Sequence, residues 1–143
     1  MNKRRLLKLA DLLEADAKNK KGIKFDLGTW ARPANARFER KEKTVPVDCN
    51  TVACAVGLAC ISGAFKREGL SHSYKSSALG GYYLVPKLGR LTDMAAAARL
   101  FGLKIREAEF LFYESSYPDG KTRGAAGERF VAKRIRDFAS GKN

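Results

Sequence analysis

Three cysteines have the clearest chemical potential in this sequence, and they lie close together at Cys49, Cys54 and Cys60. Cys49 comes just before a predicted helix start, where unpaired backbone N–H groups and the helix dipole favour a thiolate. A thiolate nucleophile needs a general base, and His72 is the one histidine in the chain. A cysteine-dependent enzyme that uses Cys49 and His72 is therefore the catalytic alternative, although no feature of the sequence brings the two residues together.

The spacing of the cysteines excludes a shared metal ion. Six residues separate Cys54 from Cys60, which is about 600° of rotation along a helix, so the two thiols leave opposite flanks. Cys49 and Cys60 share a face but lie about 16 Å apart along the helix axis. The C-x2-C spacing of zinc sites is also missing. We predict no metal site and no cofactor, and we interpret the cysteines as small packing residues among alanines.

Basic residues form the second group that could do chemistry. The formal net charge of the 143-residue chain is +13. Residues 1–24 hold eight basic and three acidic side chains, and residues 121–143 hold seven and two, so the two ends carry +10 of that charge. A field of this sign attracts polyanions such as nucleic acids and nucleotides, although it also keeps a protein soluble.

The basic side chains of the two ends form one surface if the terminal helices pack together. Arg129, Lys133 and Arg136 lie on one stripe of the predicted last helix. Two aromatic residues that follow a Gly-Gly pair are suited to stack on a base if their loop opens onto the same surface. The predicted ligand-binding residues are Lys3, Arg4, Arg5, Lys8, Tyr82, Tyr83, Arg129, Lys133 and Arg136.

A predicted helical hairpin between Met94 and Phe112, with Gly102 at its turn, matches the helix-turn-helix template of DNA-binding proteins. Its second helix, however, carries acidic residues that repel phosphates, and it presents aromatic residues suited to a protein interior. The acidic and aromatic residues in question are Glu107, Glu109, Glu114, Phe110 and Tyr113. We therefore interpret the hairpin as structural.

Helical periodicity predicts the elements that position these residues. Leucines and alanines from Leu6 to Ala17 repeat at helical spacing, and Asn19 to Gly22 ends that helix. The stretch Thr51–Ser62 is apolar on every face, which predicts a central buried helix. A last helix is predicted over Ala125–Ala139, with an inward face made by Val131, Ile135 and Phe138.

The remaining segments predict little regular structure. We expect a short turn of helix over Phe25–Trp30, an exposed loop over Ala34–Thr44 and a polar loop over Ser71–Ser77. Short strands are predicted at Val45–Val47 and Tyr82–Val85, and these two strands are expected to pair with each other.

Together these elements predict a mainly α fold: a single globular domain over residues 1–143, with four or five helices around a buried central helix and at most a short two-stranded β ribbon. The N-terminal leucines are interrupted by Lys8 and Asp11, which argues against an export signal. The longest uncharged run, Cys49–Phe65, is too short to span a membrane. The odd number of cysteines is typical of a reducing compartment, so we expect a cytoplasmic protein without a membrane partner.

Several strings of the sequence resemble a family of uncharacterised small proteins of bacteria and their phages. The most specific string is Cys-Asn-Thr-Val-Ala-Cys-Ala-Val-Gly at Cys49–Gly57, where the family often has glycine in place of Asn50 and histidine in place of the following Leu58. The resemblance implies a folded helical domain and carries no established activity. The other strings are Leu9–Leu13, Phe25–Trp30, Ala98–Leu103 and Glu107–Phe112.

The function that the sequence favours is a non-enzymatic basic binding module for a phosphate-rich partner, either nucleic acid or nucleotide, in a bacterial or phage accessory protein. The alternatives are the cysteine-dependent enzyme and a protein-interaction factor whose charge is incidental. The sequence leaves the oligomeric state open.

Overall fold

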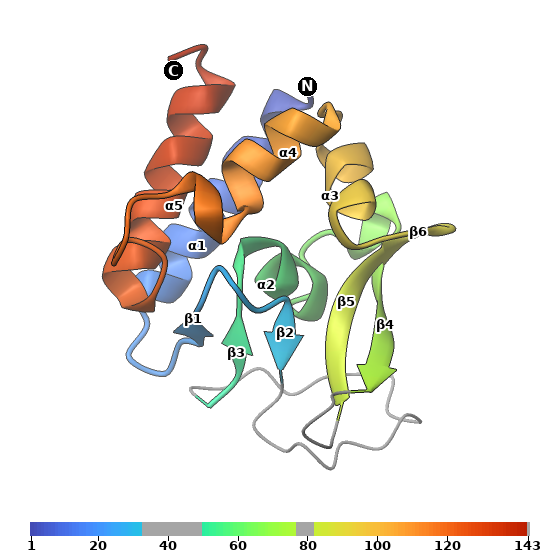
Figure 1. Ribbon diagram of the computed structural model, residues 1–143, viewed down its shortest axis with the longest axis horizontal. Coiled ribbons are helices and arrows are strands. Elements are labelled where there is room, and N and C mark those ends of the chain that lie inside the picture. Colours follow the sequence, from blue (N-terminus) through green and yellow to red (C-terminus); the bar gives the residue numbers. More distant parts are fainter. Residues whose placement is uncertain (33–49, 77–81, 143) are drawn as a thin grey trace.

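The computed structural model describes residues 1–32, 50–76 and 82–142, and in this part of the chain five α-helices accompany a six-stranded sheet (Figure 1). The helices are α1 (Lys3–Lys18), α2 (Ala55–Ile61), α3 (Asp93–Phe101), α4 (Ile105–Phe112) and α5 (Gly124–Ala139), with short 3-10 helices η1 (Lys66–Glu68) and η2 (Glu114–Ser116). The strands are β1 (Lys24–Phe25), β2 (Ala31–Arg32), β3 (Val52–Ala53), β4 (Leu70–Ser76), β5 (Tyr82–Leu88) and β6 (Leu91–Thr92).

The sheet is mixed, and its strand order is β1-β3-β2-β5-β4, with β6 added to the end of β5. Strands β1 and β3 are parallel, whereas all the other pairs are antiparallel. The longest pairing is the β4–β5 ribbon, in which Leu70 lies opposite Leu88 and Ser76 lies opposite Tyr82. The two-residue strands β1, β2 and β3 continue this ribbon toward the terminal helices (Figure 1).

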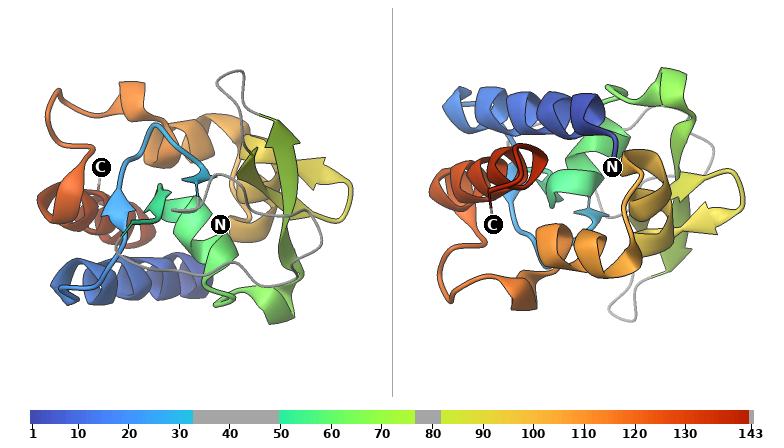
Figure 2. Two further views of the ribbon diagram at one scale, coloured as in Figure 1. Left: turned by 90° about the horizontal axis from the view of Figure 1, so that it is seen from below. Right: turned by 90° about the horizontal axis from the view of Figure 1, so that it is seen from above.

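Helix α2 lies in the middle of the molecule, where it contacts both the sheet and α1. Every residue from Ala55 to Cys60 is buried. Helices α1 and α5 lie side by side in all three views (Figures 1 and 2), and their contact is the most extensive between any two described helices. Helix α3 packs on β5, and α4 joins α3 to α5.

The helices predicted from periodicity are confirmed. Helix α1 begins after Asn2, whose side chain accepts a hydrogen bond from the Arg5 backbone N–H, as an N-cap residue does. Helix α3 ends at Gly102, which has φ +62°, a left-handed conformation that glycine adopts without steric cost. On α5, Val131 and Ile135 are fully buried, as the sequence predicted, whereas Phe138, the third residue of the predicted inward face, is only partly buried.

The mainly α prediction is wrong, because the chain forms an α/β fold with a mixed six-stranded sheet. The predicted helical turn over Phe25–Trp30 is instead strand β1 and the connection that leads into β2. The predicted helix over Thr51–Ser62 begins only at Ala55, because Val52 and Ala53 form β3 in the sheet.

The predicted polar loop over Ser71–Ser77 is also wrong, since residues up to Ser76 belong to β4. This strand lies at one edge of the sheet, where polar side chains are tolerated and the apolar pattern is weak. The strand predicted at Tyr82–Val85 is confirmed and runs on to Leu88. It pairs with β4, β2 and β6. The loop predicted at Ala34–Thr44 and the strand predicted at Val45–Val47 lie outside the described residues.

Candidate functional site

The terminal helices α1 and α5 pack against each other. The predicted basic surface shared by the two ends of the chain required this packing. The two helices are antiparallel: Arg129, near the start of α5, donates to the carbonyl oxygen of Ala17 near the end of α1 at 3.3 Å. Further along α5, Arg136 meets Asp11 and Glu14 of α1. The side of α1 that faces α5 is therefore acidic where the basic stripe reaches it.

Arg136 is neutralised by this contact. Its guanidinium donates to both carboxylate oxygens of Glu14, at 2.8 and 2.9 Å, and also to Asp11. These hydrogen bonds raise the pKa of Arg136 and lower the pKa of Glu14 from their ordinary values. On the same stripe, Lys133 pairs with Asp137 at 2.6 Å. Arg136 and Lys133 each have a carboxylate partner already. The stripe is therefore a poor binding site for phosphate.

Two of the N-terminal basic residues fasten α1 to its neighbours. Arg5 donates to the carbonyl oxygen of Leu100 in α3 at 2.8 Å. Lys8 donates to the carbonyl oxygen of Ala64, and its ammonium lies 4.7 Å from the centre of the Phe65 ring. Lys8 is also 3.7 Å from Glu68. Arg5 and Lys8 therefore have structural contacts that a ligand would have to share.

Lys3 and Arg4 are exposed on the first turn of α1, which lies beside the junction of α3 and α4. The backbone N–H of Asn2 donates to the carbonyl oxygen of Phe101 at 2.6 Å, which fixes this arrangement. Two further exposed cations, Lys104 and Arg106, start α4 at the same end of the molecule (Figure 1). The structure thus places the first turn of α1 at the end of α3, and the α4 cations follow that end in the chain. Figure 2 shows α1 and α4 on opposite sides of α5.

The acidic residue in the first turn of α4 already has a partner. Glu107 accepts a hydrogen bond from the backbone N–H of Lys104 at 2.8 Å and so caps the start of α4. We call the exposed cations at this end of the molecule the basic end. It comprises Lys3, Arg4, Lys104, Arg106 and, after the end of α5, Lys142.

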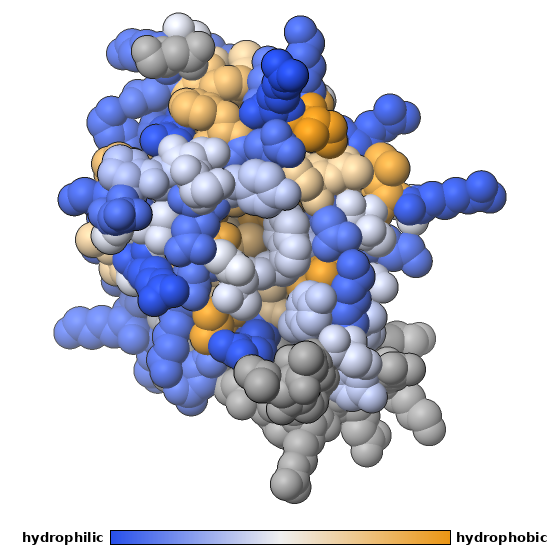
Figure 3. Space-filling view, viewed as in Figure 1, coloured by the Kyte–Doolittle hydropathy of each residue, from blue (hydrophilic) through white to orange (hydrophobic). Residues whose placement is uncertain are grey.

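Aromatic residues lie next to the basic end on the surface shared by α4 and α5. The Phe110 and Phe138 rings are 6.2 Å apart, and Phe110 is 40% exposed. Figure 3 shows hydrophobic atoms between α4 and α5, with hydrophilic side chains on both sides. We call this surface the α4–α5 face. Two shallow cavities of about 310 and 290 Å³ flank Phe110 on it. Besides Phe110, the first is lined by Phe130, Lys133, Arg134, Asp137 and Lys142, and the second by Arg106, Glu107 and Phe138.

Arg134 contacts two aromatic rings and two backbone carbonyl groups at the α4–α5 face. Its guanidinium carbon lies 4.7 Å from the centre of the Phe110 ring and 3.7 Å from that of Tyr117. The same guanidinium donates to the carbonyl oxygens of Phe110 and Ser116, at 3.3 and 2.6 Å. Carbonyl partners leave the positive charge uncompensated, so the face combines a cation with an exposed ring.

Tyr82 and Tyr83 do not join the terminal helices. Both are half-buried at the start of β5, opposite Ser76 and Lys75 of β4. In Figure 1 this end of β5 lies at the bottom of the molecule, far from the basic end at the top. The glycines that precede the tyrosines lie outside the described residues. The predicted stacking role on the basic surface therefore has no support from this arrangement.

The two described cysteines are buried thiols. Cys54 caps the start of α2, where its Sγ accepts from the backbone N–H of Gly57 at 3.3 Å. Cys60 donates to the carbonyl oxygen of Ser71 at 3.0 Å. Burial raises the pKa of Cys54 to about 11 and that of Cys60 to about 12. Both thiols are therefore protonated and unreactive near neutral pH.

The two residues of the catalytic alternative are not brought together by any described contact. Cys49 lies outside the described residues. His72 is on β4, where its ring packs edge-on against Tyr74 at 5.3 Å and burial lowers its pKa. In the described ranges, no three His, Cys, Asp or Glu side chains are arranged to hold a metal ion.

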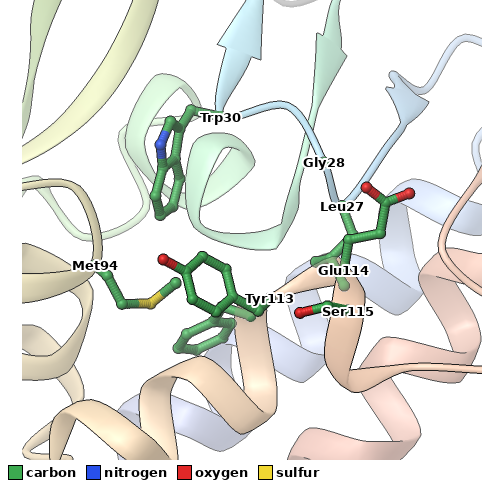
Figure 4. A pocket seen from close by; sticks show the side chains of 8 residues that line it. Leu27, Gly28, Trp30, Met94, Tyr113, Glu114 and Ser115 are labelled. Atoms are coloured by element: carbon green, nitrogen blue, oxygen red, sulfur yellow. The ribbon is translucent and has the colours of Figure 1, made fainter.

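A pocket that the sequence did not predict lies between the β1–β2 connection and the end of α4 (Figure 4). Its volume is about 330 Å³. Its lining comes from two segments more than 80 residues apart and from α3, so no local pattern could have revealed it. The only signal was the pair of aromatic residues Trp30 and Tyr113. The lining residues are Leu27, Gly28, Trp30, Met94, Phe112, Tyr113, Glu114 and Ser115.

None of the helices in the described part of the chain is both long and apolar enough to cross a membrane. No protein-family model matches this chain. No match was found among curated proteins or among solved structures. The resemblance carried by the Cys49–Gly57 string therefore stays a prediction.

Proposed function

We propose that the protein is a non-enzymatic binding module for a phosphate-rich partner, and that this partner is single-stranded nucleic acid. Phosphates would contact the cations of the basic end, and bases would stack on the α4–α5 face. The observation that carries the proposal is the exposed Phe110 ring between Arg106 on one side and Arg134 and Lys142 on the other.

Single-stranded nucleic acid fits this surface better than duplex DNA does. Proteins that bind single strands combine a positively charged track for the backbone with aromatic side chains for the bases. The helix of a helix-turn-helix protein instead presents polar side chains to the major groove. Helix α4 presents Phe110 and Ile105, which are 40% and 47% exposed, and Glu107 serves as its cap.

The charge distribution supports the same proposal. Asp11 and Glu14 are already paired with Arg136, and Asp137 with Lys133, so these carboxylates are partly neutralised before any anion arrives. The cations of the basic end itself have no carboxylate partner among the described ion pairs.

The proposal places the protein in the cytoplasm. Cys54 and Cys60 are free thiols in the fold, and free thiols persist in a reducing compartment. Nucleic acid of the cell or of an infecting phage is found there as well.

The experiment that tests the proposal compares the binding of a fluorescent oligothymidylate, the matching duplex and a set of nucleoside triphosphates at low salt. We expect the single strand to bind most tightly. Phe110→Ala should weaken that binding by about 1 kcal/mol or more, because base stacking on an aromatic ring contributes about 1–3 kcal/mol per base. The matched control is Tyr83→Ala, which removes an aromatic residue at the opposite end of the molecule.

Two results would contradict the proposal. If no polyanion binds at low salt, the charge serves solubility alone and the protein-interaction alternative gains. If the triphosphates compete fully with the oligonucleotide and Phe110→Ala has no effect, the ligand is a nucleotide and the α4–α5 face is not its site.

A further inference from the structure

The pocket beside Trp30 has the walls of a binding site. Leu27, Met94 and Phe112 are buried and form its apolar floor. In Figure 4 the Trp30 ring lies above the Tyr113 ring, and the Met94 side chain lies beside them. Tyr113 is 47% exposed, so its ring is available to a ligand. The volume of about 330 Å³ lies at the lower end of the roughly 300–1,000 Å³ that small-molecule sites occupy.

The charge of the lining sets this pocket apart from the rest of the protein. Among the described residues, Glu114 is the one carboxylate that lines the pocket, and neither a lysine nor an arginine lines it, in a chain with a net charge of +13. Three aromatic rings, a thioether and a carboxylate attract a cation and repel a phosphate. The pocket is therefore unsuited to the anionic partner of the basic end.

Backbone contacts hold the Trp30 wall in place. The carbonyl oxygen of Trp30 accepts a hydrogen bond from the backbone N–H of Cys54 at 3.2 Å. The thiol of Cys54 also points to that carbonyl, at 3.6 Å. Gly57 faces the same carbonyl, and a β-carbon at Gly57 would overlap it. The Trp30 backbone is thus fixed to the first turn of α2.

The Glu114 side chain is also positioned. Figure 4 shows it turned toward Gly28, where a β-carbon would lie 2.5 Å from its Oε2 atom. Its Oε1 atom accepts a hydrogen bond from the Thr122 hydroxyl at 3.3 Å. Because Gly28 has no side chain, the Glu114 carboxylate has space at the rim of the pocket.

We propose that this pocket binds a quaternary ammonium group. Such a cation is weakly hydrated and has no N–H groups, so it needs aromatic faces and a nearby negative charge rather than a set of hydrogen-bond acceptors. A primary ammonium would need three acceptors that converge on it. Figure 4 shows the Tyr113 hydroxyl turned toward Trp30 and the Glu114 carboxylate turned toward Gly28, so the acceptors of the lining side chains do not converge on one point. This site is independent of the function proposed above.

The same chemistry comes from two sources, a free small molecule such as choline or a trimethylated lysine side chain of another protein. The test uses the fluorescence of Trp30, the only tryptophan of the chain. Tetramethylammonium chloride, choline chloride and a short trimethyllysine peptide are titrated separately at constant ionic strength. The matched control is the neutral carbon analogue of choline, in which a tert-butyl group replaces the trimethylammonium group.

We expect a saturable change with tetramethylammonium and choline and none with the neutral analogue. The N-methyl protons of the ligand should shift upfield in NMR spectra, because they lie over aromatic rings. A peptide that binds more tightly than choline would assign the source to a protein, and the reverse order would assign it to a small molecule. An equal response to the neutral analogue, or no saturable response to any of the cations, would overturn the proposal.

Two variants test the residues. Tyr113→Ala should weaken the binding of tetramethylammonium by between about 2-fold and 30-fold, the range of a cation–π contact between exposed and desolvated sites. Glu114→Gln should also weaken it, because the variant removes a negative charge from the lining. Asp119→Asn, which removes an exposed carboxylate from the turn before α5, should leave it unchanged. Equal affinity of all three variants and the parent would place the cation elsewhere.

Discussion

Gly57 and Trp30 are in direct backbone contact: the carbonyl oxygen of Trp30 occupies the place that a side chain at Gly57 would need. The first turn of α2 therefore packs against the β1–β2 connection without any side chain between them. The resemblance to a family rested on the string that contains Cys54 and Gly57. In the structure these two residues hold the backbone that carries Trp30.

Gly57→Ala should destabilise the protein by about 1–3 kcal/mol, because an added β-carbon forces a shift of buried backbone. The Ala31 backbone nitrogen lies only 3.3 Å from the same position, so the connection has no free direction in which to move. The measurement is chemical denaturation, read from the midpoint at constant slope. Fluorescence of Trp30 in the folded state should shift too, and an unchanged midpoint would show that the contact is not tight.

The carboxyl groups of Glu128 on α5 and Asp16 on α1 face each other in the interface of the terminal helices. Glu128 is 1% exposed. Burial, together with the neighbouring Asp16 and a hydrogen bond to it, raises the pKa of Glu128 from 4.5 to about 9, while Arg129 acts weakly in the opposite direction. Glu128 is therefore protonated in the folded protein at neutral pH.

This raised pKa makes stability fall with increasing pH. Between pH 4.5 and about 9 the unfolded chain has lost the Glu128 proton while the folded chain keeps it. The free energy of unfolding should then decrease by at most about 1.4 kcal/mol per pH unit from this group. The contribution is fully present below pH 4.5 and is lost as the pH rises through 9.

Glu128→Gln tests this explanation, because an amide keeps the shape and a hydrogen-bond donor without the ionisation. The variant should be about as stable as the parent at pH 5 and more stable at pH 9, in urea denaturation at both values. If the free energies of unfolding of the two proteins changed in parallel between pH 5 and pH 9, Glu128 would not be the cause of the pH dependence.

The elements of the fold that could be predicted from the sequence are those with helical periodicity. The leucines and alanines of α1 identified a helix with one buried face, the small residues of α2 identified a buried helix, and Gly102 identified the end of α3. Strands β1, β2 and β3 have two residues each, too few to show an alternating pattern. Strand β4 is polar because it lies at the sheet edge.

The candidate sites depend on contacts between distant residues, which explains what the sequence missed. The stripe on α5 was correctly placed on a helix, but nothing local indicates that Arg136 meets Asp11 and Glu14. Phe110 and Tyr113 are aromatic residues suited to a protein interior, yet the fold leaves them 40% and 47% exposed, and no local pattern shows what lies beside them. Physical proximity of Trp30 to Tyr113 required the packing of the β1–β2 connection against α4.

Cys54 and Cys60 should resist thiol reagents until the protein unfolds. Their pKa values of about 11 and 12 leave a thiolate fraction on the order of 10⁻⁴ or less at pH 7. A colorimetric disulfide reagent should therefore titrate at most one of the three cysteines in the native protein and all three in denaturant. Rapid labelling of two or more native thiols would contradict the buried assignment. Selective fast labelling of Cys49 would instead favour the catalytic alternative.

The salt dependence of single-strand binding tests the central claim most directly. Each phosphate contact on a single strand contributes about 0.7 to the slope of log affinity against log salt. A variant with Lys3, Arg4, Lys104 and Arg106 changed to Ala should therefore reduce the slope by about 3. The charge-matched control changes Lys20, Lys21, Lys24 and Lys121, which are exposed and lie outside the basic end. We predict that the control keeps nearly the parent slope, whereas equal slopes in the two variants would show that binding is not localised at the basic end.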